Sequence, residues 1–175
     1  VPLSTVFDHK HSVLSGILEK LKSRIVLSGH PGNMTKGVHY ESTFAATPVG
    51  STERVLNALM VKLGLERLAF DIKQAYLHAE MESGYDAIIC EYPQGYQEWN
   101  GDEKLYILLN KNIYGHPSGA ANWETKRNEF VCGEEMRSRG WRVTPCWDTD
   151  PCLFYIEKGD EYMWALIHTD DTDCY

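Results

Sequence analysis

The chain has 175 residues, of which 43% are hydrophobic, and this length and composition predict one globular domain over residues 1–175. Its net charge of -8 excludes a broadly basic surface of the kind that coats nucleic acids, although a local basic groove is compatible with it. The longest apolar runs have about six residues, far fewer than the roughly 20 that a membrane-spanning helix needs.

The first part of the chain is predicted to form a hairpin and then a helix. Residues 4–9 and 24–28 have the composition of two short paired strands. Ser51 or Thr52 is expected to cap a helix whose apolar residues recur at helical spacing. Gly64 is expected to end this helix.

The rest of the chain is predicted to combine further strands with one long helix. The expected strands are residues 65–72, 87–92 and 105–109, followed by a hairpin of residues 152–157 and 162–168. The expected helix covers residues 122–139, with Phe130 among its inward residues. Helices mixed with antiparallel strands predict an α+β fold in which an antiparallel sheet packs on helices.

The cysteines and histidines point to no structural metal or disulfide framework. The five cysteines are odd in number and form no Cys-x-x-Cys pair, which favours free thiols in an intracellular, reducing compartment. A zinc site is not expected, because its ligand spacings are missing. His9 and His11 would share one face of a strand, but we interpret them as exposed polar residues.

Acidic residues end two of the predicted strands. Asp71 closes the strand of residues 65–72, and Asp170 and Asp171 follow the second arm of the later hairpin. Magnesium prefers carboxylate oxygens, and two ions about 4 Å apart can activate an attacking oxygen and stabilise a leaving group. We therefore expect Asp71 and Asp170 to bridge two ions, with Asp171 in support. The alternative is that residues 169–173 form a solvated turn, since aspartate is favoured in turns.

Seven segments, two of which contain these aspartates, occur in an order that a known family shares. They are Lys22–Val26 (KSRIV), Gly37–Ala45 (GVHYESTFA), Asp71–Leu77 (DIKQAYL), Tyr92–Tyr96 (YPQGY), Ile113–Gly115 with Trp123 (IYG…W), Asp150–Phe154 (DPCLF) and His168–Asp171 (HTDD). Through them the chain resembles, over almost all of its length, the reverse transcriptase domain of copia-type LTR retrotransposons. In that family this domain is part of a Pol polyprotein.

The resemblance implies a fold, an activity and a set of ligands. The fold would be a right-hand polymerase palm with partial fingers. The activity would be RNA-directed DNA synthesis, a nucleotidyl transfer that uses two Mg²⁺ ions, an RNA or DNA template-primer and deoxynucleotides. Asp71, Asp170 and Asp171 would be the catalytic metal ligands.

Three further residues acquire substrate-binding roles from the resemblance. Tyr76 would contact the incoming sugar and disfavour a 2′-hydroxyl, although a packed aromatic residue is an equally good interpretation. Lys22 and Arg24 would lie in the fingers, near the triphosphate or the template.

The sequence also departs from the family pattern. His168 and Thr169 replace the tyrosine and valine before the two aspartates, which would alter the surface that supports the 3′ end of the primer. Ser28 stands where the family usually has an arginine, and serine cannot form a bidentate phosphate contact. Both kinds of change leave the metal ligands in place.

A second hypothesis comes from the length of the chain. Because it begins with Val1 and has no thumb or ribonuclease H after Tyr175, we expect it to be a fragment. We also expect the strand that returns after Asp171 to be missing. The chain would then be a catalytically inactive, domesticated structural subunit of a larger assembly, with its sheet completed by another chain.

Overall fold

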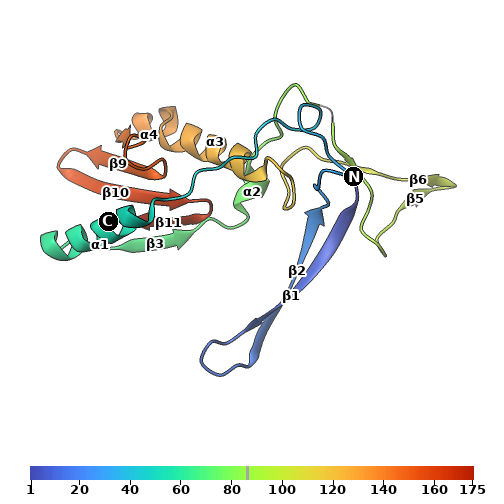
Figure 1. Cartoon of the computed structure of the whole chain (residues 1–175), viewed down its shortest axis with the longest axis horizontal. Coiled ribbons are helices and arrows are strands. Elements are labelled where there is room, and N and C mark those ends of the chain that lie inside the picture. The colour runs from blue at the N-terminus through green and yellow to red at the C-terminus, as the bar shows by residue number, and fades with distance from the viewer. Residues whose placement is uncertain (86) are drawn as a thin grey trace. The chain divides into compact units, whose positions relative to one another are not determined.

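The computed structural model describes residues 1–85 and 87–175, which divide into two compact units (Figure 1). Unit 1 comprises residues 1–43 and 80–119, and unit 2 comprises residues 44–79 and 120–175. Both combine antiparallel strands with loops, and unit 2 contains most of the helical residues. Within the described ranges no helix is long and apolar enough to cross a membrane. The expectation of a single domain stays a prediction.

Unit 1 is built on the predicted hairpin, whose strands are longer than expected. Strands β1 (Leu3–His11) and β2 (Leu18–Leu27) pair antiparallel and form a long two-stranded arm (Figure 1). The other pairs are short: β4 (Ile89–Cys90) with β7 (Ile107–Leu108), and β5 (Trp99–Asn100) with β6 (Glu103–Lys104). The strands predicted over residues 87–92 and 105–109 therefore exist but are only two residues long.

A glycine at the base of the hairpin explains part of one motif. The Leu27 N–H donates to the Tyr114 carbonyl at 2.7 Å, which brings the two backbones together. A Cβ on Gly115 would lie 2.1 Å from the Leu27 carbonyl oxygen, and Gly115 has a φ of +86°. Only glycine satisfies both conditions without strain. The glycine of Ile113–Gly115 is therefore required for packing in unit 1.

Unit 2 is organised around a five-stranded antiparallel sheet with the order β3-β11-β10-β9-β8. These strands are β3 (Leu68–Asp71), β8 (Arg142–Pro145), β9 (Leu153–Lys158), β10 (Glu161–His168) and β11 (Asp171–Cys174). The predicted hairpin of residues 152–157 and 162–168 is confirmed as β9 and β10. Mixed helices and antiparallel sheets agree with the expected α+β class.

The expectation that the returning strand is missing was wrong. Strand β11 follows Asp170 directly and pairs with β10 on one side and with β3 on the other. Tyr175 extends this pairing, because its N–H and carbonyl bond to the backbone of Trp164 at 2.9 and 3.0 Å. The sheet therefore needs no second chain to complete it at this position.

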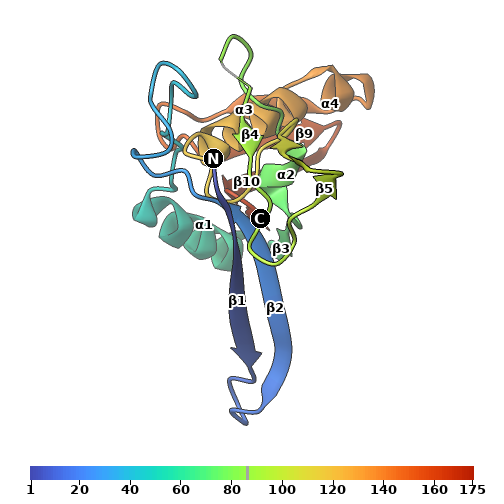
Figure 2. The same ribbon diagram turned by 90° about the vertical axis from the view of Figure 1, so that its right-hand side faces the viewer.

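Helices cover both faces of this sheet (Figures 1 and 2). Helix α1 (Gly50–Leu63) packs Leu56 on Leu153 and Leu166 of one face. On the opposite face lie α3 (Gly119–Val131) and α4 (Glu134–Ser138), where Val131 packs with Phe154. A short helix, α2 (Ala75–His78), follows β3.

The helix expected over residues 122–139 is instead two helices, α3 and α4. The chain leaves the helical path at Gly133, the extended N-cap of α4. A Cβ on Gly133 would lie 2.0 Å from the Glu129 carbonyl oxygen, so this close approach needs glycine. Phe130, expected to point inward, is 55% exposed.

The start of α1 also differs from the prediction. Its N-cap is Val49, and no side-chain cap is present, so neither Ser51 nor Thr52 caps the helix. The buried Asp150 carboxylate instead accepts hydrogen bonds from the N–H groups of Val49 and Cys152, each at 2.8 Å. The aspartate of the Asp150–Phe154 motif thus ties α1 to the start of β9. Gly64, as predicted, ends the helix in the left-handed conformation.

Candidate active site

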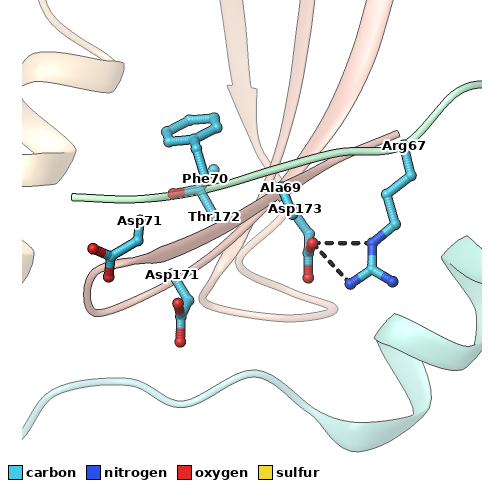
Figure 3. A pocket seen from close by; sticks show the side chains of 7 residues that line it. All are labelled: Arg67, Ala69, Phe70, Asp71, Asp171, Thr172 and Asp173. Carbon is cyan, nitrogen blue, oxygen red and sulfur yellow. Dashed lines mark hydrogen bonds and ion pairs between the residues drawn. The ribbon is translucent and has the colours of Figure 1, made fainter. Parts of the chain in front are cut away.

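Two of the predicted metal ligands face each other across neighbouring strands. Asp71 ends β3, Asp171 begins β11, and the antiparallel register pairs them directly. Directly opposed residues have Cβ atoms about 4.5–5.5 Å apart and project from the same face. Figure 3 shows both carboxylates on one side of the two strands and Phe70 on the other. The fold thus makes one pair from two aspartates that are distant in sequence.

The pair lines an open hollow of about 430 Å³, whose other charged residues are Asp173 and Arg67. Arg67 donates from Nε and Nη2 to Asp173 Oδ1, at 3.0 and 2.8 Å (Figure 3). These hydrogen bonds raise the pKa of the Arg67 guanidinium above its ordinary value. Across residues 1–85 and 87–175, no cation forms an ion pair with Asp71 or Asp171. Opposed like charges destabilise a sheet, so a cation placed between the two carboxylates would relieve their repulsion.

Asp170 occupies the turn between β10 and β11. Its carbonyl accepts a hydrogen bond from the Ile72 N–H at 2.8 Å, and the preceding Thr169 carbonyl accepts one from Trp123 Nε1 at 2.6 Å. Thr169 has a φ of 53°, a conformation that β-branched residues rarely adopt. Asp170 is not among the described residues that line the hollow. The structure therefore brings Asp171, rather than Asp170, opposite Asp71.

A third strand, β10, places a histidine beside the two opposed aspartates. His168 of β10 is paired in register with Asp171, which in turn is paired with Asp71. Because opposed residues share a face, His168 stands on the same side of the sheet as the two carboxylates. The replacement of the family's tyrosine by His168 thus places an imidazole on the carboxylate face.

The protein alone does not present a complete metal-ligand set. Within the part of the chain that the structure describes, no three histidine, cysteine or acidic side chains converge to hold an ion. Magnesium commonly uses only one or two carboxylates and takes its other ligands from water and substrate phosphates. The Asp71 and Asp171 pair fits that pattern.

The ion pair between Arg67 and Asp173 was not predicted from the sequence. Asp173 is two residues after Asp171, so on a strand the two share a face. This spacing could have indicated that Asp171 and Asp173 lie on one face, but only if residues 171–174 had been predicted to form a strand. Arg67 precedes β3 and reaches Asp173 across the strand pair, a contact that depends on register.

The predicted substrate-binding residues lie in both units. Tyr76 belongs to α2 in unit 2, where it is half-buried and packs on the cluster of Ala75, Ala79 and Trp123. Lys22 and Arg24 belong to β2 in unit 1, where alternate positions place both on one face of the hairpin. Their roles stay predictions.

Comparisons with known proteins agree with these motifs. The family described as reverse transcriptase (RNA-dependent DNA polymerase) matches residues 1–139, a range that includes Asp71 and ends before Asp170. No solved structure matches the chain.

Three curated relatives are Pol polyproteins of plant transposons. The chain is 27% identical over 155 residues to the retrovirus-related Pol polyprotein from transposon TNT 1-94 of Nicotiana tabacum, covering 88% of this chain and 11% of the relative. It is 23% identical to those from transposons RE1 and RE2 of Arabidopsis thaliana, covering 95% and 89% of this chain and 10% of each relative. The chain thus spans about a tenth of the length of these relatives. With a family match over most of its residues and the ordered motifs above, the chain belongs to the copia-type reverse transcriptases (RNA-dependent DNA polymerases).

Proposed function

We propose that the chain forms the palm and part of the fingers of an RNA-directed DNA polymerase that uses two magnesium ions. Unit 2 would be the palm and unit 1 the partial fingers. The observation that carries the proposal is the in-register pair of Asp71 and Asp171, which shares one exposed face and forms no ion pair within the described ranges. Family membership supplies the reaction class.

The donor chemistry of this pair fits magnesium. Carboxylate oxygens are hard ligands, and strand positions hold their spacing stiffly. The bond from the Ile72 N–H to the Asp170 carbonyl ties the end of β3 to the turn that carries the third proposed ligand. Asp71, Asp170 and Asp171 would hold the ions. When bound, the two ions would activate the primer 3′-hydroxyl and neutralise charge on the transferred phosphate and the leaving group.

Substrate positioning would fall to residues outside the acidic pair. Tyr76 would limit the space beside the incoming sugar, because α2 follows Asp71 closely and its packing with Trp123 restrains the ring. Lys22 and Arg24 would contact the triphosphate or the template as cations on the β1–β2 arm. The partners would be an RNA or DNA template-primer and deoxynucleotides.

The same proposal places the protein in an intracellular, reducing compartment. All five cysteines are free thiols. Burial raises the pKa of Cys152 to about 11 and also raises the pKa of Cys90 and Cys174, which keeps these thiols protonated near neutral pH.

Primer extension on an RNA template tests the proposal. The chain is assayed alone and within a Pol polyprotein that contains it, with Mg²⁺ or with EDTA. We expect Mg²⁺-dependent extension that Asp71→Asn or Asp171→Asn lowers by at least about a hundredfold. Asp173→Asn, a matched loss of charge on the same face, should have a much smaller effect. A folded polyprotein that extends no primer, or an Asp71→Asn variant as fast as wild type, would refute the proposal.

The alternative of an inactive structural subunit depended mainly on a missing strand. Strand β11 is present and paired on both sides, which removes that argument. No contact among the described residues favours the alternative over catalysis.

A further inference from the structure

An apolar cavity lies in unit 2, on the face of the sheet that α3 covers. Its volume is about 380 Å³, within the range of small-molecule binding sites. Phe70 of β3 and Thr172 of β11 line it and are paired in register. Because side chains alternate along a strand, these two project from the face opposite to Asp71 and Asp171 (Figure 3). The same two strands therefore carry the opposed aspartates on one face and this cavity on the other.

The cavity combines buried walls with two exposed aromatic side chains. Trp123, Val131 and Ile167 form buried parts of its lining. Phe70 and Phe130 also line it, yet they are 47% and 55% exposed. A molecule that covered both phenylalanine rings would remove apolar surface from water, and aromatic rings pack well on one another. The lining thus favours a planar aromatic ligand.

One buried hydroxyl in the lining lacks a partner. Thr172 is only 4% exposed, and its Oγ1 is buried without a hydrogen bond to any described residue. A buried hydroxyl in this state costs free energy that a valine of the same shape would avoid. A ligand with a polar group near Thr172 would supply the missing hydrogen bond. Ligand sites typically place such single polar groups among apolar walls.

The charged residues around the cavity are all basic. Its lining includes His78, Lys126 and Arg127 but no acidic side chain. Arg127 is buried and pairs with Glu124 at 3.4 Å, which offsets its charge. Lys126 is exposed and forms no ion pair within residues 1–85 and 87–175. This excess of positive charge complements a negatively charged ligand.

We propose that this cavity is a binding site for a small aromatic anion. Phe70 and Phe130 would pack on its aromatic body, and Thr172 would form a hydrogen bond with a polar group at its buried end. Lys126 would pair with its negative charge. The site is separate from the proposed metal site, and its occupancy does not depend on polymerase activity.

Two fluorescent probes with the same rings test the proposal. One is 1-anilinonaphthalene-8-sulfonate, an aromatic anion, and the other is N-phenyl-1-naphthylamine, which lacks the sulfonate. Wild type should bind the anion saturably. Phe130→Ala should weaken binding of both probes by about tenfold. Lys126→Met should weaken binding of the anion by about fivefold and leave the neutral probe unchanged.

A third variant and two controls separate binding from folding. Thr172→Val should weaken both probes by about fivefold although it removes an unpartnered hydroxyl from the free protein. Phe7→Ala is the control for an exposed phenylalanine, because Phe7 is 72% exposed on β1. Lys62→Met is the control for an exposed lysine, on α1. Neither control residue lines the cavity, so both affinities should stay at their wild-type values.

Three results would overturn the inference. One is a wild-type protein that binds neither probe. Another is a Phe130→Ala protein, folded by circular dichroism, that binds both probes as tightly as wild type. The third is a loss of binding in Phe7→Ala, which would place the probes on the β1–β2 arm instead of in the cavity.

Discussion

Replacing Asp171 by asparagine should stabilise the metal-free protein. The change removes one of two like charges that are paired in register with Asp71. With the two carboxylates about 6 Å apart in a water-like dielectric, the repulsion is about 0.7 kcal/mol. Asparagine keeps nearly the same shape, so the free energy of unfolding should rise by about that amount.

Urea unfolding in low-salt buffer with EDTA measures this effect. Four of the five tryptophans lie in unit 2, so tryptophan fluorescence reports mainly on the unit that holds the site. The gain should vanish in 1 M salt, where the screening length falls to about 3 Å. Added Mg²⁺ should stabilise wild type and leave Asp171→Asn unchanged.

Asp173→Asn is the matched control on the same strand and face. It breaks the exposed pair with Arg67, so it should lower the free energy of unfolding by up to about 1 kcal/mol. The two asparagine variants therefore have effects of opposite sign. A loss of stability for Asp171→Asn in low salt would refute the reasoning, because it would show that the Asp171 carboxylate has a stabilising partner.

Three further predictions concern buried or tightly packed residues. Burial lowers the pKa of His116 from 6.5 to about 4, so at pH 5 the unfolded chain binds a proton that the folded chain excludes. Urea unfolding should therefore show a free energy of unfolding about 2 kcal/mol lower at pH 5 than at pH 7. The variant His116→Gln should largely remove this difference. Thr172 has a buried hydroxyl to which no described residue forms a hydrogen bond. Thr172→Val should therefore raise the free energy of unfolding by about 1 kcal/mol in the same assay, and a decrease of that size would contradict the prediction. Gly133→Ala should lower the free energy of unfolding by about 1–3 kcal/mol, because the added Cβ would overlap the Glu129 carbonyl. The control Gly50→Ala, in the first turn of α1, should leave the free energy of unfolding unchanged or raise it slightly.

The two hairpins could be predicted because their signals are local. Strands β9 and β10 are runs of mostly apolar and aromatic residues on either side of Gly159, whose φ of +61° suits a tight turn. Strand β11 could not be predicted in the same way, because Asp171 and Asp173 are residues that strands disfavour. Pairing with β10 and β3 on its two sides imposes the extended conformation.

The candidate site was predicted only in part for the same reason. Asp71 and Asp171 follow from an acidic residue at each strand end, and the structure pairs them. The distinction between Asp170 in the turn and Asp171 on the strand needs the register, which the sequence does not specify. The contact between Arg67 and Asp173 joins residues 106 positions apart, and no local pattern encodes it.

The measurement that tests the central claim most directly is a Mn²⁺ titration followed by electron paramagnetic resonance. Wild type, Asp71→Asn and Asp173→Asn are compared at low ionic strength. If the opposed pair binds the metal, wild type should show saturable binding, Asp71→Asn should bind at least about tenfold more weakly, and Asp173→Asn should match wild type. Equal affinities for wild type and Asp71→Asn would contradict the account, because the metal would then bind somewhere other than the pair of Asp71 and Asp171.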